Sequence, residues 1–500
     1  MKLSVLMGGR AGQGINKISQ IISEVLKKHG YFTFNYRDYQ SLIRGGHNFN
    51  VLVISDKKIS SSESKINYIL AMDELTTNLH KKELTKNGRV IDFKQFEKLN
   101  KNINIALAGA FIKILGIEKK CLIDEIKKEF NNKDSLIAAE KGYNSQKEEL
   151  KLKKLKNKIN IISGSQAVAQ GAINSELDLY IAYPMTPATG VLHELASRKA
   201  KHKVFQPENE IAVVNSALGA SFTGKKTMIG TSGGGYDLMT EGISLQGMSE
   251  IPLTVYLASR PGPATGVPTY TSQSDLNIAV RSGHGEFPRV VVAPGDPIEA
   301  IEKTNEALYL SEKFNCLSIL LSDKHLAESE YSTNGKINRT INFNIKRKVP
   351  GKTIVKASSY EHDKYGNTTE EAYYVKKNAE ARLEKYKKIQ THVKKYEMIK
   401  IHGKKNSKNL IIGWGSTKGV ILDAIEGLDY KFLQVLYIKP MSDQIKKEIK
   451  KAKKVILIEN NATGQLGRII REKTGIKIKN RILKYDSRPF LCDELRKELK

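Results

Sequence analysis

The chain has 500 residues, of which 40% are hydrophobic, and a formal net charge of +29 at pH 7. A chain of this length exceeds what one hydrophobic core usually organises, so we expect about two to four domains. No window reaches the roughly 18 uncharged apolar residues that a membrane span needs, and the first apolar stretch is too short for a signal sequence, which predicts a cytoplasmic protein.

The positive charge is a weak argument for nucleic-acid binding. Lysines are spread along the chain and gather in 147–158, 346–356 and 376–408, where we expect linkers and solvated helix faces. No aromatic residues are interleaved with them, and no helix-turn-helix or zinc-finger pattern occurs, so we do not expect a nucleic-acid partner. A basic surface can also attract acidic partners.

The three cysteines, Cys121, Cys316 and Cys492, lie far apart in the sequence. Iron–sulfur clusters usually use closely spaced cysteines such as C-x₂-C, and neither that spacing nor a zinc knuckle occurs here. Cys316 stands in a run typical of a buried strand, where a thiol is inert. If the chain takes part in redox chemistry, we therefore expect its cluster on another subunit.

The chain begins with an apolar strand, a Gly-rich turn and a helix. Apolar residues recur at helical spacing and a glycine closes the pattern, at Ile15, Ile18, Ile22, Leu26 and Gly30. A second strand over 31–36 follows, which indicates a domain over 1–155 that begins as a βαβ unit. The turn from Gly8 to Gly14 either offers backbone N–H groups to a phosphate or uses glycine only for tight packing, and spacing alone leaves both open.

The charged stretch 147–159 has the composition of a connector to a central α/β domain at 160–330. A basic stretch follows at 331–405, with a helix expected across 370–396. The last segment, 406–500, alternates apolar strands with helices, which predicts a second, smaller parallel α/β unit. The predicted fold class is therefore α/β throughout.

Loops rich in Gly, Pro and Thr in the central domain are the most informative feature of the sequence. Each stands beside an apolar strand or a helix of small residues. They are YPMTPATG at 183–190, ENEIAVVNSALGAS at 208–221, TSGGGYDLMTEG at 231–242 and RPGPATGVPT at 260–269. This alternation predicts strand ends that deliver the loops to one edge of a parallel sheet, where such folds bind ligands.

In amino-acid sequence and in order along the chain, these loops resemble the pyrimidine-binding (PYR-type) domain of thiamine-diphosphate-dependent 2-oxoacid:ferredoxin oxidoreductases, specifically their alpha subunit. Residues 1–155 resemble the gamma domain of the same family, fused ahead of alpha. Residues 406–500 resemble its transketolase C-terminal domain, through the signature Glu459-Asn460 and Gly464-Gln465-Leu466. The resemblance implies three α/β domains: a gamma-type domain, a pyrimidine-binding parallel-sheet domain at 160–330 and a transketolase C-terminal-like domain.

The resemblance implies a carboxylate beside N1′ of the cofactor's aminopyrimidine, where it promotes the imino tautomer. Glu208 and Glu210 are the candidates, and Glu210 has the glycine nine positions later, Gly219, that thiamine enzymes usually carry. We therefore expect Glu210 to be catalytic, with Glu208 as the alternative and as a cofactor-binding residue. Without the resemblance, a glutamate in a first helical turn is often only a favourable charge for the helix dipole.

The resemblance also implies an arginine that anchors the substrate carboxylate. Arg260 follows an apolar strand, and its planar fork suits bidentate binding of a carboxylate, although a surface salt bridge is the simpler alternative. Thr269 closes the same loop, and Thr186 matches the family's Y-P-I-T-P threonine. We expect all three to bind substrate, with Arg260 and Thr186 also catalytic. The further cofactor-binding candidates are Tyr183, Pro184, Gly233 and Gly234.

In the gamma-type domain the resemblance implies an association with coenzyme A as co-substrate. The candidates are residues of the Gly-rich turn and of the later R-G-G-H run. They are Gly9, Arg10, Gly12, Gly14, Arg44 and His47.

A complete diphosphate site needs a G-D-G motif followed by an asparagine that coordinates Mg²⁺, as the family's chemistry implies. The nearest string is Pro294-Gly295-Asp296-Pro297, where proline replaces the second glycine. We therefore expect no metal ligand in this chain, and expect Mg²⁺ and a [4Fe-4S] cluster on a beta subunit. The two subunits would share thiamine diphosphate in an alpha–beta heterodimer or its dimer.

The implied function is that of a gamma–alpha fused subunit of a 2-oxoacid:ferredoxin oxidoreductase. Such an enzyme decarboxylates a 2-oxoacid oxidatively to an acyl-CoA and reduces ferredoxin, with 2-oxoglutarate as the favoured substrate. The alternatives are pyruvate or branched-chain specificity, a thiamine-dependent decarboxylase or transketolase-like enzyme without electron transfer, and a non-catalytic protein that uses its positive charge for binding.

Overall fold

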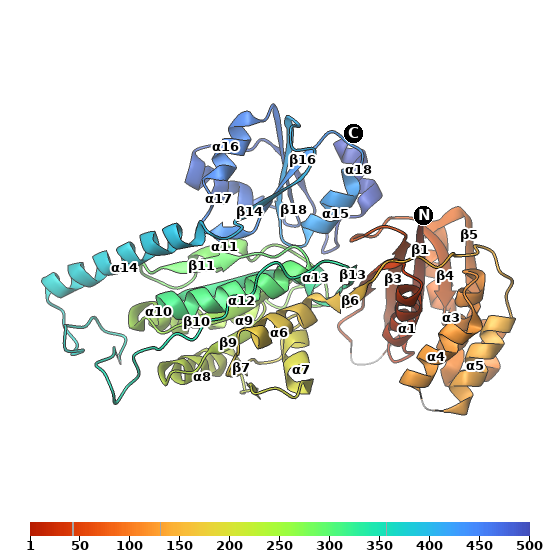
Figure 1. Ribbon diagram of the computed structural model, residues 1–500, viewed down its shortest axis with the longest axis horizontal. Coiled ribbons are helices and arrows are strands. Elements are labelled where there is room, and N and C mark those ends of the chain that lie inside the picture. Colours follow the sequence, from red (N-terminus) through yellow and green to blue (C-terminus); the bar gives the residue numbers. More distant parts are fainter. Residues whose placement is uncertain (43–44, 131, 357) are drawn as a thin grey trace. The chain divides into compact units, whose positions relative to one another are not determined.

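The computed structural model describes residues 1–42, 45–130, 132–356 and 358–500, and Figure 1 labels its helices and strands. The chain divides into two compact units. The first comprises Met1–Ser163, Ser329–Gly335 and Leu491–Lys500, and the second comprises Gly164–Glu328 and Lys336–Phe490.

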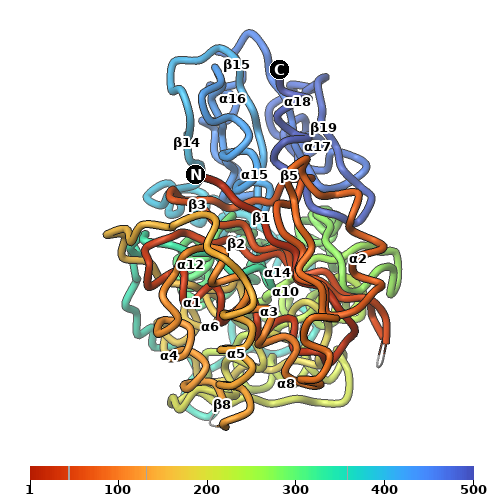
Figure 2. The backbone as a smooth tube through the Cα atoms, turned by 90° about the vertical axis from the view of Figure 1, so that its right-hand side faces the viewer, coloured from red at the N-terminus to blue at the C-terminus, as the bar shows by residue number. Residues whose placement is uncertain are grey.

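The first unit is built on a seven-stranded mixed sheet. From edge to edge its strands are β5 (Leu84–Asp92), β4 (Ile66–Ala71), β1 (Lys2–Arg10), β3 (His47–Ser55), β2 (Phe32–Asp38), β13 (Glu330–Thr333) and β6 (Asn160–Ser163). Figure 2 traces β1, β3 and β2 side by side, and the three pair antiparallel. On the other side of β1, β4 and β5 pair in parallel.

Helices pack on this sheet through one buried cluster of apolar side chains. Those that contribute to the cluster are α1 (Ile15–Lys28), α3 (Ile103–Ile114), α4 (Lys119–Glu129) and α5 (Lys133–Asn144), with the 3₁₀ turn η2 (Phe93–Asn102). The unit also contains α2 (Glu74–His80), α18 (Cys492–Leu499) and the 3₁₀ turn η1 (Lys81–Glu83). In α1 the apolar positions expected from the spacing are all buried. The chain then turns at Gly30, whose φ of +80° and contact with the Leu155 carbonyl leave no room for a side chain.

The second unit contains a seven-stranded sheet that is parallel except at one edge. Its strands are β17 (Tyr437–Lys439), β11 (Arg289–Val292), β12 (Leu317–Asp323), β10 (Leu253–Ser259), β9 (Thr227–Thr231), β7 (Leu179–Ile181) and β8 (Lys203–Phe205). Every residue of β10 and β12 is buried. Continuous apolar strands of this kind are typical of parallel sheets that are covered on both faces.

A five-stranded sheet completes the second unit. Its strands are β14 (Ile399–Gly403), β16 (Lys431–Val435), β15 (Asn409–Trp414), β18 (Lys454–Glu459) and β19 (Asn480–Leu483), of which only β14 runs antiparallel. The two sheets share one apolar cluster, to which both Val291 of β11 and Leu433 of β16 belong.

The helices of the second unit connect and cover these two sheets (Figure 1). They are α6 (Gly164–Asn174), α7 (Thr189–Ser197), α8 (Glu210–Phe222), α9 (Gly233–Leu238), α10 (Thr240–Ser249), α11 (Leu276–Arg281), α12 (Pro297–Phe314), α13 (Lys324–Glu328), α14 (Ala372–Val393), α15 (Thr417–Ala424), α16 (Gln444–Lys451) and α17 (Gln465–Thr474). The helix expected across 370–396 is α14. None of the helices among the described residues is long and apolar enough to cross a membrane.

The three α/β sheets confirm the expected fold class. The compact units, however, divide the chain differently from the expected domain bounds. Strands β6 and β13 join the first sheet, and α18 belongs to the first unit, where Asp493 accepts a hydrogen bond from the Ser64 amide at 2.9 Å. The expected bounds at 155, 160, 330 and 405 stay a prediction about the family's domains.

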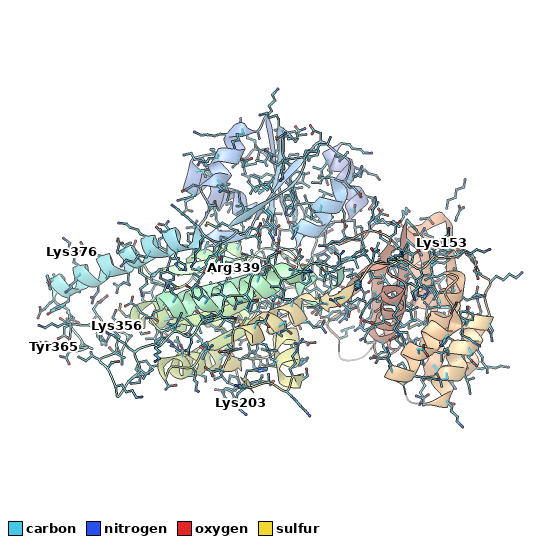
Figure 3. The ribbon with its side chains drawn as sticks, in the orientation of Figure 1. Lys153, Lys203, Arg339, Lys356, Tyr365 and Lys376 are labelled. Atoms are coloured by element: carbon cyan, nitrogen blue, oxygen red, sulfur yellow. The ribbon has the colours of Figure 1, made fainter. Side chains whose placement is uncertain are left out.

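The basic side chains are spread over the chain rather than gathered on one element. Figure 3 labels Lys153 in the connector, Lys203 in β8 and Lys376 in α14, and all three are exposed. Cys316 is buried, and burial raises the pKa of its thiol to about 12, so it stays protonated and unreactive.

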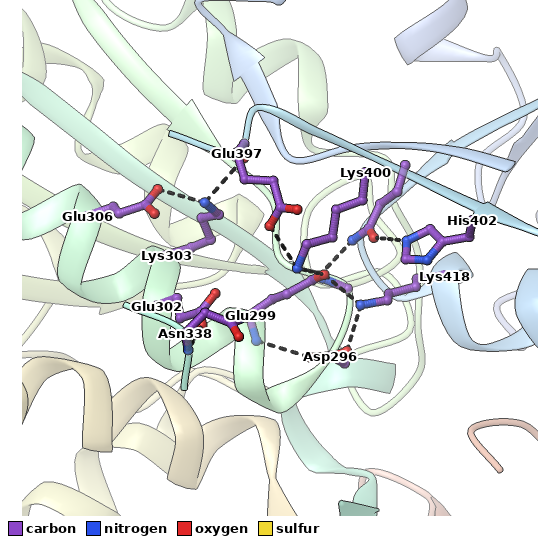
Figure 4. A network of polar contacts seen from close by, with 12 residues as sticks. Asp296, Glu299, Glu302, Lys303, Glu306, Asn338, Glu397, Lys400, His402 and Lys418 are labelled. Carbon is purple, nitrogen blue, oxygen red and sulfur yellow. Dashed lines mark hydrogen bonds and ion pairs between the residues drawn. The ribbon is translucent and has the colours of Figure 1, made fainter. Parts of the chain in front are cut away.

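A buried ion network joins the start of α12 to the second sheet of its unit (Figure 4). Lys418 lies 2.6 Å from Asp296 and 2.5 Å from Glu299, and Lys400 lies 3.0 Å from Glu299. Gln434 donates a further hydrogen bond of 2.6 Å to Glu299. Burial and Asp296 raise the pKa of Glu299, but Lys418 and Lys400 outweigh them and hold it below the ordinary value.

Replacing Lys418 by methionine should destabilise the second unit by about 3–5 kcal/mol, because two carboxylates lose a buried partner. Urea unfolding can be followed by the fluorescence of Trp414, the single tryptophan, which is buried in the same unit. The control Lys451→Met breaks a more exposed pair with Glu448 and should cost less than about 1 kcal/mol.

The pH dependence follows from the lowered pKa of Glu299. Its contribution to stability is present above the unfolded pKa of about 4.3 and is lost as the pH falls through the folded value. The loss in the free energy of unfolding caused by Lys418→Met should therefore become smaller in acid. If the difference in unfolding free energy between wild type and Lys418→Met stays constant down to the lowest pH at which both fold, the ion network does not cause that difference.

Candidate active site

The parallel strands β7, β8, β9, β10 and β12 end at one edge of their sheet. The loops singled out in the sequence follow these strand ends, as expected. Ligands of open α/β sheets bind at this edge, because the loops between strands and helices converge there. The edge lies wholly within the second compact unit.

Glu210 is the first residue of α8, which follows β8. The Asn209 side chain caps the helix by accepting a hydrogen bond of 2.9 Å from the Ala212 amide. Glu210 is only 3% exposed, and its Oε1 has no hydrogen-bond partner. Glu208, the other candidate, is exposed. Of the two carboxylates, only that of Glu210 is buried at the sheet edge.

Arg260 directly follows β10, and its guanidinium reaches across the edge to the loop after β7. Its Nη1 donates a hydrogen bond of 2.9 Å to the Thr186 carbonyl, while its buried Nε has no partner. Burial lowers the pKa of Arg260, and the charges of Asp275 and Glu210 oppose this shift. The structure thus brings Arg260, Thr186 and Glu210 together.

The glycines of α9 fill the space between these groups. An added Cβ at Gly235 would lie 2.7 Å from Glu210 Oε1, and one at Gly233 would lie 2.6 Å from an Asp275 oxygen. Contacts this short exclude any side chain unless its neighbours move. Gly234, by contrast, would meet only the Ala264 carbonyl at 3.6 Å, an ordinary van der Waals distance.

Several buried polar atoms along this edge lack a hydrogen-bond partner among the described residues. They are Glu210 Oε1, Ser232 Oγ, Arg260 Nε, Thr269 Oγ1 and Ser274 Oγ. An unsatisfied buried group costs about 1–3 kcal/mol, so such groups are rare unless a ligand pairs with them. This donor and acceptor set fits a polar ligand with a ring nitrogen and a carboxylate.

Asp275 is a site residue that sequence reasoning missed. It is partly buried and accepts a hydrogen bond of 2.8 Å from Ser259 Oγ. Burial is the main cause that raises the pKa of its carboxyl to about 6. The only local signal was an acidic residue that ends a run of Thr, Ser and Gln residues at 271–274.

The second sheet of the unit holds the loop that carries Asp275. Gln273 is bonded on both sides, because it donates to the Trp414 carbonyl at 2.8 Å and accepts from the Asn460 amide at 2.9 Å. Gln465 accepts from the Asn277 amide at 2.9 Å and donates to the Ser274 carbonyl at 2.7 Å. Residues of the transketolase-like signature therefore position the edge of the neighbouring sheet.

The remaining candidates occupy different surroundings. Tyr183 and Pro184 are exposed, Thr186 is partly buried, and Thr269 is buried in the loop that begins at Arg260. The string Pro294-Gly295-Asp296-Pro297 is used structurally, since Asp296 caps α12 and pairs with Lys418.

The coenzyme A candidates lie in the first unit. Gly9 is buried, Arg10 and Gly12 are exposed, and Gly14 precedes α1. His47 is buried, with its Nε2 2.8 Å from that of His80. Arg44 lies outside the described residues.

The α9 contacts predict opposite effects of alanine at neighbouring glycines. Gly235→Ala should destabilise the second unit by about 1–3 kcal/mol, because its methyl group meets the Glu210 carboxylate. Gly234→Ala should be neutral or stabilise by up to about 1 kcal/mol, because alanine favours a helix. Urea unfolding followed by Trp414 fluorescence measures both. Equal changes in unfolding free energy at the two positions would contradict the close contact between Gly235 and Glu210.

Models of known protein families match two parts of the chain. Residues 170–398 match the family described as "Pyruvate flavodoxin/ferredoxin oxidoreductase, thiamine diP-bdg", and residues 4–99 match "Pyruvate ferredoxin/flavodoxin oxidoreductase". The 2-oxoglutarate synthase subunit KorA of Archaeoglobus fulgidus is 37% identical over 34% of this chain and 51% of its own.

Other similarities extend over the whole chain, among them the following two. A solved 2-oxoglutarate:ferredoxin oxidoreductase from Magnetococcus marinus, with 2-oxoglutarate, coenzyme A and succinyl-CoA bound, has a TM-score of 0.90 at 25% identity and covers 100% of this chain and 99% of that one. The 2-oxoacid:ferredoxin oxidoreductase subunit alpha of a Sulfolobus species is 30% identical over 100% of this chain and 96% of its own. This chain therefore belongs to the alpha subunits of the 2-oxoacid:ferredoxin oxidoreductases, enzymes that use ferredoxin as the electron acceptor.

Proposed function

We propose that this chain supplies the aminopyrimidine side of a thiamine diphosphate site and the anchor for a 2-oxoacid, with 2-oxoglutarate as the substrate. The observation that carries the proposal is the pair of unbonded atoms, Glu210 Oε1 and Arg260 Nε, at one sheet edge. The two side chains act on each other electrostatically. The names of the Magnetococcus and Archaeoglobus relatives support 2-oxoglutarate over other 2-oxoacids.

The residues at the edge fit the cofactor's aminopyrimidine. Glu210 would hold a proton at N1′, since its Oε1 is buried and has no hydrogen-bond partner among the described residues. Gly233 and Gly234 would let the ring approach the backbone, with Tyr183, Pro184 and Glu208 at the rim. When bound, thiamine diphosphate supplies the carbanion chemistry that breaks the bond to the substrate's carboxyl group.

Arg260 would bind the substrate carboxylate. Its Nη1 is held by the Thr186 carbonyl, which fixes the plane of the guanidinium and leaves Nε free to donate. The hydroxyl of Thr269, also unbonded, would add a second donor. A guanidinium held in this way binds a carboxylate with little loss of conformational entropy.

A beta subunit would cover this edge. Large apolar side chains are exposed on the loops and helices that surround it, which marks a protein-binding surface. They are Tyr183, Phe205, Ile211, Leu238 and Val267. We propose that the partner supplies the Mg²⁺ site and the [4Fe-4S] cluster, and that the complex passes electrons to ferredoxin in an alpha–beta heterodimer or its dimer.

In the first unit, we propose that the Gly-rich turn contacts coenzyme A. Arg10 is exposed, and no atom of the described part of the chain lies within 4 Å of a Cβ built at Gly12, which favours a turn open to a ligand. A phosphate group suits backbone N–H groups at the start of a helix and a nearby arginine.

The proposal is tested by Glu210→Gln in the purified complex. The variant should exchange the C2 proton of bound thiamine diphosphate at least about 100-fold more slowly, because glutamine cannot take up the proton. Deuterium exchange followed by NMR measures this step without turnover. The matched control Glu208→Gln, at the exposed carboxylate two residues earlier, should slow the exchange far less, because a carboxylate at the rim does not hold the proton at N1′. The reverse pattern would refute the assignment.

A second experiment tests the subunit contact at α8. Among residues 1–42, 45–130, 132–356 and 358–500, no atom lies within 4 Å of a Cβ built at Gly219, and its helix position is exposed. Gly219→Leu should leave the isolated chain as stable or more stable, since leucine favours a helix, but should block association with the beta subunit. Gly219→Ala serves as the small control. Size-exclusion chromatography after co-expression measures association, and normal assembly of the leucine variant would exclude this face from the contact.

A further inference from the structure

Asp275 is an ionisable group at the proposed anchor to which no role has yet been given. Its carboxylate accepts a hydrogen bond from Ser259, the residue before Arg260, at 2.8 Å. On the other side, the space for a Cβ at Gly233 lies 2.6 Å from Asp275 Oδ2. The carboxylate is therefore wedged between the end of β10 and the start of α9.

The charged groups that act on Asp275 come from two neighbouring elements. Arg260, after β10, favours the ionised form, and Asp237 of α9 opposes it. Glu210 of α8 also acts on Arg260, so the guanidinium interacts electrostatically with the carboxylates of both Glu210 and Asp275. The side chains that hold the Asp275 loop, Gln273 and Gln465, are uncharged.

A 2-oxoacid that docks on Arg260 adds another anion to this group. Two carboxylates would then compete for one guanidinium in a partly buried site, where repulsion between like charges is strong. Protonation of one of the two carboxylates removes this repulsion. Asp275 can accept it because its carboxyl is already balanced between the two forms near neutral pH, with a pKa of about 6 caused mainly by burial.

We propose that Asp275 is a positioning residue that takes up one proton when the substrate carboxylate binds Arg260 and releases it when the site empties. This inference rests on the proposed function of Arg260 as the anchor. The charge balances, because one carboxylate and one proton enter together and Asp275 becomes neutral, so the number of anionic groups that act on Arg260 stays the same. Asp275 then acts through Arg260 without touching the reacting atoms.

The linkage has a definite sign. Below the pKa of free Asp275, about 6, the carboxyl is protonated with or without substrate, and binding is independent of pH. Above that pH, binding must include proton uptake, so KM for the 2-oxoacid should rise by up to about tenfold per pH unit until the pKa of the bound state is passed.

The test measures KM and kcat for 2-oxoglutarate in the complete complex between pH 5.5 and 8.5. Asp275→Asn, an uncharged side chain of the same shape, should have a KM that no longer depends on pH in this range and that equals the wild-type value in acid. The pH profile of kcat should keep its wild-type shape. Titration with 2-hydroxyglutarate in two buffers of different ionisation enthalpy should count about one proton taken up by the wild type at pH 7.5 and none by the variant.

Asp237→Asn is a second variant that keeps the test decisive if Asp275→Asn does not fold. Removing this exposed neighbour should shift the rise in KM to lower pH without abolishing it. A wild-type KM that does not change with pH, or a wild-type slope retained in Asp275→Asn, would overturn the inference.

Arg260→Ala separates this inference from the proposed function. If Arg260 is the anchor, the alanine variant should have a raised KM at every pH, including acid. An unchanged KM in Arg260→Ala would refute the anchor itself. A raised KM there, combined with a wild-type slope in Asp275→Asn, would refute only the proton uptake.

Discussion

Glu210 keeps a carboxylate oxygen buried and unbonded, and this constraint governs the structure around it. An ionisable group of this kind is tolerated only if the rest of the fold is stable enough to offset a cost of about 1–3 kcal/mol. The continuous apolar strands β10 and β12 and the shared core of the two sheets provide that stability. A ligand that pairs with the oxygen recovers the cost as binding energy.

The glycines of α9 are the second part of the same constraint. Gly233 lies against Asp275 and Gly235 against Glu210, so both carboxylates come close to one short helix because its first three residues carry no side chains. Gly234, between them, would make only an ordinary van der Waals contact through an added Cβ, so the close approach concerns the two flanking glycines.

The position of the loop that carries Asp275 depends on the second sheet of the unit. Asn460 and Gln465 bond to the backbone and side chains of the loop that precedes α11, and the buried network around Glu299 and Lys418 joins the same two sheets. Hydrogen bonds between charged and buried groups hold such an arrangement better than apolar contacts alone, because they specify one geometry. The transketolase-like segment therefore has a positioning role in addition to a place in the core.

The sequence alone predicted the α/β class, the helix at Ile15, the long helix before β14 and the convergence of the loops on one edge, because these follow from local periodicity and from turn residues at strand ends. It also favoured Glu210 over Glu208 by the spacing to Gly219, and only the former is buried. Asp275 and the Gln273–Asn460 bonds were decided by the tertiary structure, since residues 187 positions apart meet only when two sheets pack. The union of β6 and β13 with the first sheet arose in the same way. Local patterns record which face of an element is buried, but not which distant element will cover it.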